Sequence, residues 1–180
     1  YYLNILPLYH IAGLSVFFRS IYFGFISVVF DYDKDEIIKQ ILEYKIDYIS
    51  LVPKMIYNMI KRNHLKVLEN NIKMITVGGD GVNQYIYSHL KNNNLNTYIS
   101  YGMTETSSGI SGYFINKKEN FEDGFIGDAH ESVEILLEDR YIAIKSNVVM
   151  HKYVNDVVCN NKFITKDLGE LKSGKVYFLS

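Results

Sequence analysis

The sequence has little cysteine, no excess of charge of one sign and no long apolar run, and each absence excludes a class of protein. One cysteine, Cys159, among 180 residues excludes an internal disulfide and a thiol-rich zinc site. The 19 basic and 20 acidic side chains nearly cancel, which disfavours binding to nucleic acid or to an anionic membrane surface. No stretch reaches the roughly 18 apolar residues of a membrane helix. We therefore expect a globular protein of the reducing cytoplasm, with no integral membrane segment.

Apolar residues make up 48% of the chain, which is enough to bury a core in one domain or two small ones. Residues 1–6 and 175–179 both have the composition of strands, and the first residue is Tyr1 rather than methionine. We therefore expect the chain to be an incomplete piece of a longer protein.

The first 105 residues alternate short apolar runs with stretches of helical period. This alternation is typical of βαβ units and a parallel sheet. It predicts strands at residues 1–6, 25–30, 47–51, 72–77 and 97–100, and helices at 14–22, 36–44, from Pro53 onward, and 82–90. Gly24 is expected to close the first helix. Asp33 followed by Glu36 predicts a capping box at the start of the second helix.

After residue 110 the pattern changes to short strands separated by turns. Strands are predicted at residues 133–137, 141–145, 162–165 and 176–179, as in a small antiparallel sheet or barrel. The polar stretch 116–120 favours a boundary nearby. The predicted fold is therefore α/β, with a parallel sheet flanked by helices in residues 1–112 and a small antiparallel β subdomain in residues 113–180.

Chemically distinctive residues follow four of the predicted strands. In an open parallel sheet, ligands bind beyond the carboxyl ends of the strands, so these positions are the first candidates for a site. Residues 78–81 read Gly-Gly-Asp-Gly, and paired glycines let the backbone approach a ligand closely. Residues 104–106 read Thr-Glu-Thr, which places hydroxyls beside a carboxylate that could hold a metal ion. Taken alone, the first segment is more often a turn and the second is more often a helix cap.

The combination of these segments resembles the adenylate-forming superfamily of acyl-CoA ligases, luciferases and peptide-synthetase adenylation domains. Residues 101–105, Tyr-Gly-Met-Thr-Glu, resemble its phosphate-binding core motif, and residues 6–13 resemble its acyl-pocket gate motif. The glycine pair at 78–79 stands where this family binds adenine. Residues 163–169 resemble the ribose-binding motif, and Gly124-Phe125-Ile126-Gly127 matches the turn before the barrel strands. The resemblance covers essentially the whole chain.

The resemblance implies an ATP-dependent acid:CoA ligase that works by adenylation followed by thioesterification. Its cofactors would be ATP or AMP and Mg²⁺, with coenzyme A as co-substrate and a small aromatic carboxylic acid as partner. Residues 6–19 are most similar to the branch that activates o-succinylbenzoate for menaquinone synthesis. The chain would then be the second half of the large N-terminal domain. Another acyl-CoA synthetase, an adenylation domain that loads a carrier protein, and a non-catalytic remnant stay open as alternatives.

The phosphate and ribose motifs imply roles for five residues. Thr104 would hydrogen-bond the α-phosphate, and Glu105 would hold the magnesium ion. Tyr101 would stack on adenine beside Gly102, and Asp167 would accept hydrogen bonds from the ribose hydroxyls. The alternatives are a solvated loop carboxylate for Glu105, a turn residue for Asp167 and a core residue for Tyr101.

The remaining candidates contact adenine or the acid. Gly78, Gly79 and Asp80 would bind the adenine, and His10 would gate the acyl pocket or steady the carboxylate. Arg19, in an otherwise apolar helix, would pair with the second carboxylate of o-succinylbenzoate. The alternatives are a hydrogen-bonded core histidine at position 10 and a guanidinium that reaches solvent at position 19.

Two positions depart from the family pattern, and further segments are expected outside the chain. Lys166 replaces the glycine of the ribose motif, and Asp80 replaces a small or differently charged residue; both bear on nucleotide affinity. The loop that binds the ATP β- and γ-phosphates is expected before Tyr1, and the domain with the catalytic lysine after Ser180. We therefore expect the fragment alone to form no acyl-adenylate.

Overall fold

The computed structural model describes residues 1–118, 120–154 and 158–179. The chain divides into two compact units. Unit 1 consists of Tyr1–Ile99 and Phe114–Phe121, and unit 2 consists of Ser100–Tyr113 and Glu122–Ser180. The domain boundary between residues 112 and 113 stays a prediction.

Unit 1 contains a parallel sheet in which the strands follow the order β2-β1-β3-β4-β5. The strands are β1 (Tyr2–Asn4), β2 (Ser27–Val29), β3 (Tyr48–Leu51), β4 (Met74–Val77) and β5 (Thr97–Met103). Every strand predicted for this part of the chain is present, and most are shorter than predicted. β5 is longer, and its last residues belong to unit 2.

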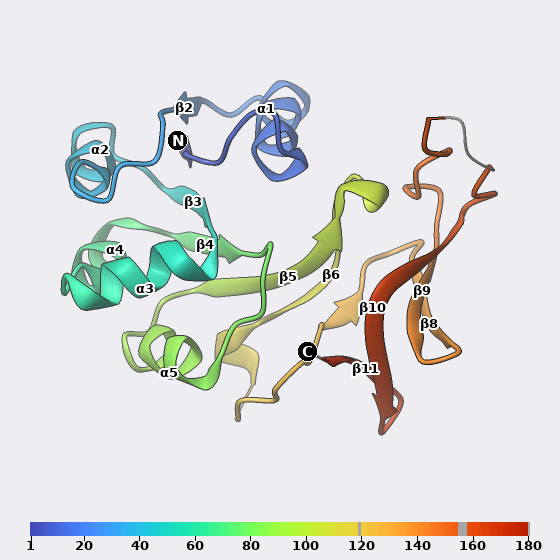
Figure 1. Cartoon of the computed structure of the whole chain (residues 1–180). Coiled ribbons are helices and arrows are strands. Elements are labelled where there is room, and N and C mark those ends of the chain that lie inside the picture. Colours follow the sequence, from blue (N-terminus) through green and yellow to red (C-terminus); the bar gives the residue numbers. More distant parts are fainter. Residues whose placement is uncertain (119, 155–157, 180) are drawn as a thin grey trace. The chain divides into compact units, whose positions relative to one another are not determined.

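Five α-helices flank these strands in the described part of unit 1. They are α1 (Ile11–Phe23), α2 (Ile37–Glu43), α3 (Pro53–Lys61), α4 (Leu65–Asn71) and α5 (Gln84–Asn92). Figure 1 shows α1 on one side of strands β1–β4, and α2, α3 and α4 on the other side. No sequence pattern predicted α4, because a helix of 7 residues is too short to show a clear period.

Two of the predicted helix signals are confirmed. Gly24 ends α1 in the left-handed conformation, with φ of 70°, and its N–H donates to the carbonyl of Ser20. Pro53 occupies the first turn of α3, where its missing N–H costs no hydrogen bond. Gly24 therefore marks the end of α1, and Pro53 marks the start of α3.

The predicted capping box of α2 is wrong. The helix begins after Glu36, and no side chain caps it. The Asp33 carboxylate instead accepts the backbone N–H of Asp35 at 2.7 Å, which forms a local turn that competes with the cap. Side-chain capping occurs at α5, where Asn83 accepts the N–H three residues further on at 3.0 Å.

The core of unit 1 lies between the strands and their helices. It consists of aliphatic side chains that are almost completely buried, and a side chain of this kind contributes roughly 1.5–3 kcal/mol when it leaves water. The largest of them are Leu3, Ile37, Ile41, Ile46, Ile49, Leu51, Ile56, Met59, Leu68, Ile75, Leu90 and Leu95. Burial from both strands and helices holds the loops at the carboxyl ends of β1, β3 and β4 in place.

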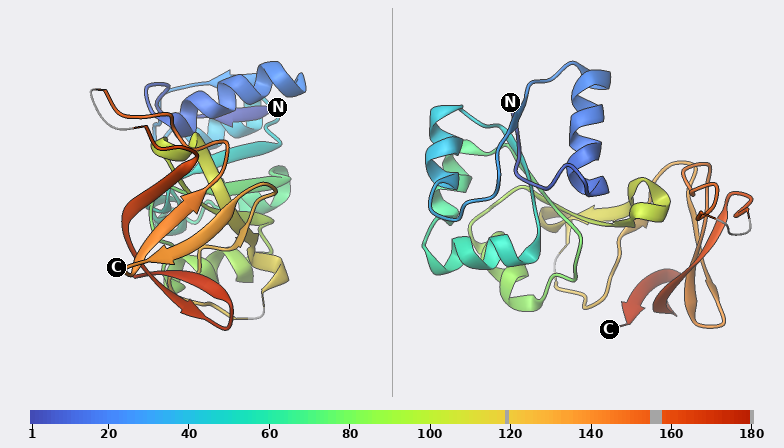
Figure 2. Two further views of the ribbon diagram at one scale, coloured as in Figure 1. Left: turned by 90° about the vertical axis from the view of Figure 1, so that its right-hand side faces the viewer. Right: turned by 45° about the horizontal axis from the view of Figure 1, so that its top comes forward.

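Unit 2 contains the end of β5, the strands β6 (Ser108–Phe114, whose last residue belongs to unit 1) and β7 (Asp128–Ala129), and a separate antiparallel sheet. That sheet has the order β11-β10-β9-β8. Its strands are β8 (Glu134–Glu138), β9 (Tyr141–Lys145), β10 (Lys162–Lys172) and β11 (Lys175–Leu179). Figure 2 shows these four strands, in orange to red, as a curled sheet. The predicted fold class is therefore confirmed.

Strand β10 is much longer than the predicted strand at residues 162–165. Its first part pairs with β9, and residues from Leu168 onward pair with β11, while the pairing with β9 is irregular between Ile164 and Leu168. An irregularity of this kind bends a strand and re-aims its side chains. The predicted ribose motif lies at this bend.

None of the helices in residues 1–118, 120–154 and 158–179 is both long enough and apolar enough to span a membrane.

Gly127 lies where no other residue fits. Its φ is +87°, and a Cβ atom there would lie 2.2–2.4 Å from backbone atoms of Gly112. We predict that Gly127→Ala lowers the free energy of unfolding by several kcal/mol, because a clash with backbone adds to the roughly 1–2 kcal/mol of the left-handed conformation. Thermal unfolding of the whole protein measures the loss.

Gly174→Ala is the matched control. Gly174 also has a positive φ of +77°, but nothing lies within 4 Å of a Cβ atom there. This variant should lose only the conformational part, roughly 1–2 kcal/mol. Equal losses in the two variants would show that the close approach at Gly127 contributes nothing.

Candidate functional site

The phosphate-like motif lies where β5 returns into β6 through η1, the short 3₁₀ helix Thr104–Thr106. We call residues 100–109 the β5–β6 return. A Cβ atom at Gly102 would lie 2.1 Å from the carbonyl oxygen of Ser108, and one at Gly109 would lie 2.2 Å from the hydroxyl of Ser100. Glycine is therefore required at position 102, where the clash is with backbone, whereas at position 109 the only close atom is the end of a side chain. Gly102 thus has a structural reason to be glycine, independent of a ligand.

Thr106 fixes the shape of this return from inside. Its side chain is buried, and its hydroxyl accepts the N–H of Met103 at 3.1 Å. The same oxygen lies within hydrogen-bond distance of the carbonyls of Met103 and Ser108. Ser107 and Ser108 have positive φ values of 55° and 107°, a sparsely populated conformation that the surrounding bonds maintain. The sequence pattern alone did not distinguish the inward hydroxyl of Thr106 from the hydroxyl of Thr104.

With Thr106 turned inward, the other two residues of η1 face outward. Thr104 is exposed, and Glu105 is half-buried. The Glu105 carbonyl accepts the N–H of Met150 at 2.7 Å, and one oxygen of its carboxylate, Oε1, accepts a hydrogen bond from the hydroxyl of Tyr153. The Glu105 side chain is therefore fixed by hydrogen bonding, unlike a freely solvated loop carboxylate. No sequence pattern pointed to Tyr153, because its contact spans 48 residues.

Asp167 of the ribose-like motif meets Tyr101 of the phosphate-like motif. The Tyr101 hydroxyl donates to Asp167 Oδ2 at 2.6 Å, and the N–H of Asp167 donates to the hydroxyl of Thr165 at 3.0 Å. Burial and the neighbouring Asp167 carboxylate raise the pKa of Tyr101 well above its usual value. Tyr101 therefore stays protonated and acts as a hydrogen-bond donor to this carboxylate.

Tyr101 is also part of the packing of unit 2. Its ring lies against a cluster of buried side chains that includes Ile110, Ile142 and Ile144. The alternative that Tyr101 is a core residue therefore holds for part of its ring, while its hydroxyl reaches Asp167.

Lys166 replaces the family's glycine without backbone strain. It is not among the described residues with positive φ, so a side chain is tolerated at this position. Its side chain is exposed, whereas the preceding Thr165 is buried. The substitution therefore leaves the hydrogen bonds of Asp167 intact.

In unit 1, residues 6–13, which resemble the acyl-pocket gate motif, connect β1 to α1. His10 is the residue before α1; it is exposed, and its ring lies 5.1 Å from that of Tyr9. The alternative that His10 is a buried core residue is therefore wrong. The segment is fixed by Gly13, where a Cβ atom would lie 2.4 Å from the Leu6 carbonyl, and by buried Asn4, whose amide donates to Gly13 at 2.9 Å.

Arg19 lies on α1 and is exposed. Its guanidinium has no ion-pair partner within residues 1–118, 120–154 and 158–179. The apolar side chains around it are themselves exposed, by 42–83%, and they are Phe17, Phe18, Ile21 and Tyr22. The helix therefore presents an open, largely apolar surface with one positive charge on it.

The glycine pair follows β4, at the same edge of the parallel sheet as the residues that follow β1 and β3. Gly78 donates its N–H to the Leu51 carbonyl at 3.3 Å, and Gly79 has a φ of +84°. Asp80 is exposed, and its carboxylate accepts the N–H of Gly81 at 2.7 Å. Asp80 therefore closes its own turn.

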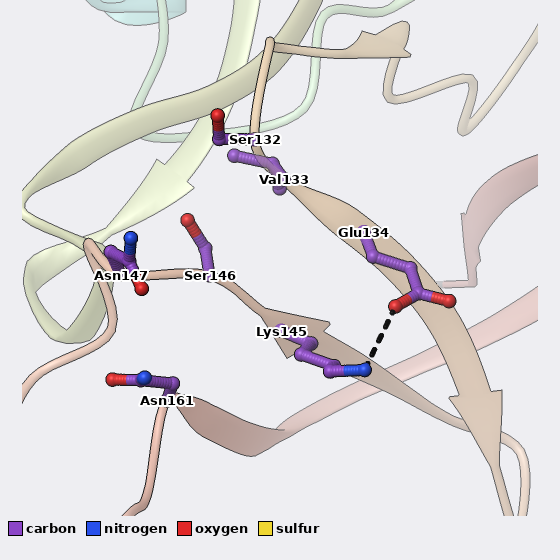
Figure 3. Close-up of a pocket in the computed structure, with 7 residues that line it drawn as sticks. All are labelled: Ser132, Val133, Glu134, Lys145, Ser146, Asn147 and Asn161. Carbon is purple, nitrogen blue, oxygen red and sulfur yellow. Dashed lines mark ion pairs between the residues drawn. The ribbon is translucent and has the colours of Figure 1, made fainter.

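Unit 2 also has a surface hollow of about 390 Å³, shown in Figure 3. Lys145 and Glu134 form an ion pair across part of it, with 3.5 Å between charged atoms. Its lining residues are Ser132, Val133, Glu134, Lys145, Ser146, Asn147 and Asn161. None of the predicted site residues lines this hollow, so it is separate from the candidate site.

The donor set fits a magnesium ion shared with a nucleotide better than an ion held by protein alone. Over the part of the chain that the structure describes, no three potential metal-binding side chains cluster. Mg²⁺ commonly uses one or two carboxylates together with substrate phosphates. The single held carboxylate of Glu105, with Oε1 engaged by Tyr153, agrees with that pattern.

Several solved structures have the same fold as this chain. O-succinylbenzoate coenzyme A synthetase from Bacillus subtilis in complex with AMP is 27% identical with a TM-score of 0.86, over 99% of this chain and 40% of that one. The same enzyme has been solved with ATP and magnesium ion, and with the acyl-adenylate OSB-AMP. The Escherichia coli enzyme, at 18% identity and a TM-score of 0.80, shows the shared fold.

Curated relatives of this chain include several 2-succinylbenzoate–CoA ligases. The 2-succinylbenzoate–CoA ligase of Lactococcus lactis is 29% identical over 99% of this chain and 40% of its own length. That of Staphylococcus aureus strain JH9 is 35% identical over 59% of this chain and 22% of its own length. The chain thus spans at most about 40% of these relatives. A sequence model of the family described as AMP-binding enzyme matches residues 1–146, and the chain therefore belongs to the AMP-binding, adenylate-forming family.

Proposed function

We propose that the whole protein containing this segment is an ATP-dependent acid:CoA ligase, and that its acid is o-succinylbenzoate, an intermediate of menaquinone synthesis. The single observation that carries the proposal is the hydrogen bond between Tyr101 of the phosphate-like motif and Asp167 of the ribose-like motif. It joins two segments that the resemblance assigns to one nucleotide. The names of the relatives support the choice of acid, and the relative solved with OSB-NCoA supports coenzyme A as acceptor.

Asp167 is proposed to bind the ribose. An ionised carboxylate has about four acceptor positions, so Oδ2 can keep the bond from Tyr101 while Oδ1 faces the two hydroxyls. Each charge-assisted bond would contribute roughly 1.5–3 kcal/mol. Because Tyr101 is a neutral donor, it orients the carboxylate without removing its charge.

The resemblance supports adenine as the proposed ligand of the glycine pair in unit 1, and of Tyr101 and Gly102 in unit 2. Gly79 is exposed and has no side chain, which supports close approach of a flat ligand to its backbone. Gly78 and Asp80 flank it, and the Asp80 carboxylate keeps the turn closed through its bond to Gly81.

The reacting phosphate is proposed to lie at η1. The exposed Thr104 hydroxyl would donate to the α-phosphate, and the Glu105 carboxylate would hold the magnesium ion. A bound magnesium ion offsets the negative charge of the phosphates during attack by the substrate carboxylate. These side chains position the reactants and supply no covalent chemistry of their own.

The acid is proposed to bind beside α1. His10 would gate the acyl pocket or steady the reacting carboxylate. Arg19 would pair with the ring carboxylate through a planar two-bond contact, and its exposure leaves the guanidinium free to do so. His10 belongs to the fixed connection between β1 and α1, and Arg19 lies further along α1.

Two other functions belong to different classes and are separable by experiment. An adenylation domain would transfer the acyl group to a carrier protein instead of coenzyme A. A non-catalytic remnant would bind nucleotide without exchanging pyrophosphate. A cytoplasmic location fits the ligase, because ATP and coenzyme A are cytoplasmic substrates.

We predict that Glu105→Ala reduces magnesium-dependent adenylation by roughly a hundredfold in the whole protein, because it removes the metal-binding carboxylate. ATP–pyrophosphate exchange with o-succinylbenzoate, measured across magnesium concentrations, tests this. Glu131→Ala removes an exposed carboxylate of unit 2 outside the motifs and should exchange normally. Wild-type exchange by Glu105→Ala at limiting magnesium would refute the role of Glu105.

We predict that Arg19→Ala lowers kcat/KM for o-succinylbenzoate by roughly a hundredfold, because it leaves a carboxylate of the substrate unpaired. Arg19→Lys should recover only part of the loss, since an ammonium cannot form the planar two-bond contact. A benzoylpropionate analogue that lacks the ring carboxylate is the substrate control, and its kcat/KM should hardly change. Equal losses for the two acids would assign Arg19 to the structure of α1 instead.

A further inference from the structure

The segment between β9 and β10 contacts Glu105 at two points. We call residues 146–154 the 146–154 loop. The Met150 N–H donates to the Glu105 carbonyl at 2.7 Å, and the Tyr153 hydroxyl donates to Glu105 Oε1. The first bond holds the backbone of the candidate metal ligand, and the second holds its carboxylate.

The 146–154 loop is itself fixed at its base. Val149 is buried in the hydrophobic cluster of unit 2 that contains Ile110 and Ile142. Buried Ser146 donates its N–H to the Asn161 carbonyl at 2.9 Å, and its hydroxyl accepts the N–H of Val148 at 3.3 Å. The loop is therefore attached to the core on one side and to Glu105 on the other.

The Tyr153 ring is also oriented. It lies edge-on to Phe163 of β10, with 6.4 Å between ring centroids, and Phe163 packs against the hydrophobic cluster. A phenol held in this way is a directional, uncharged donor. It occupies Oε1 of Glu105, and within residues 1–118, 120–154 and 158–179 no hydrogen bond or ion pair to Oε2 is found.

We propose that Tyr153 is a positioning residue that orients the Glu105 carboxylate toward the magnesium ion of the bound nucleotide, an inference that rests on the proposed function. The partner of a metal-binding side chain fixes its orientation, and losing it typically weakens metal affinity or activity 10–100-fold. A carboxylate already held in place also loses less conformational freedom when the metal–nucleotide complex binds.

The opposite possibility makes a different prediction. If the phenol competed with the metal for the carboxylate, removing its hydroxyl would strengthen metal binding. If the bond only held the 146–154 loop in place, its removal would reduce activity equally at every magnesium concentration. The direction of the change in metal affinity separates these cases.

Tyr153→Phe in the whole protein is the test, because it removes the hydroxyl and keeps the ring against Phe163. Electron paramagnetic resonance of Mn²⁺ in the presence of ATP measures metal binding directly. We expect about a tenfold weaker Mn²⁺ affinity, and pyrophosphate exchange that falls about tenfold at limiting magnesium and recovers at saturating magnesium. Tyr141→Phe, at an exposed tyrosine of β9, is the control and should change neither quantity.

A double-mutant cycle adds specificity. In a Glu105→Gln background, Tyr153→Phe should have no further effect on Mn²⁺ affinity, because the oriented ligand has already been lost. Unchanged or tighter Mn²⁺ binding by Tyr153→Phe would overturn the inference. If the wild-type protein binds Mn²⁺ with ATP but shows no pyrophosphate exchange with any carboxylic acid tested, the proposed function is overturned instead. A wild-type protein that does not bind Mn²⁺ with ATP would overturn both.

Discussion

The close return of the chain between β5 and β6 is the constraint on which the rest of the candidate site depends. The backbone approaches itself so closely that residue 102 must be glycine, and buried Thr106 holds the turn from inside. Because Thr106 faces inward, Thr104 and Glu105 face outward at the tip. Because β5 is fixed, Tyr101 reaches Asp167 on β10. A single local geometry therefore positions the proposed phosphate, metal and ribose contacts of unit 2.

A second feature recurs at both acidic residues of the site. Asp167 accepts a hydrogen bond from Tyr101, and Glu105 accepts one from Tyr153. A phenol stays neutral at physiological pH, and for Tyr101 the raised pKa strengthens that tendency. Each carboxylate is thus oriented by an uncharged donor, which brings no positive charge next to it. A lysine or arginine in place of Tyr101 or Tyr153 would orient the carboxylate, but its positive charge would offset the negative charge of the carboxylate.

The sequence predicted the local features of this protein and missed those that join distant residues. The strand and helix periods and the Gly24 helix end each depend on residues close together in sequence, and the structure contains both features. The contact of Tyr153 with Glu105 joins residues 48 apart, and no periodicity reports such a contact. The capping box at Asp33 failed because a competing local turn forms there. The roles of the site residues and the boundary at residue 112 stay predictions.

The most direct test of the proposed nucleotide contacts is a crystal structure of the whole protein with bound AMP. The account predicts that both ribose hydroxyls lie within hydrogen-bond distance of the Asp167 carboxylate, with Tyr101 still donating to Oδ2 and its ring against the adenine. The α-phosphate should lie beside the Thr104 hydroxyl at the tip of the β5–β6 return. AMP bound elsewhere, with Asp167 paired only to Tyr101, would contradict it.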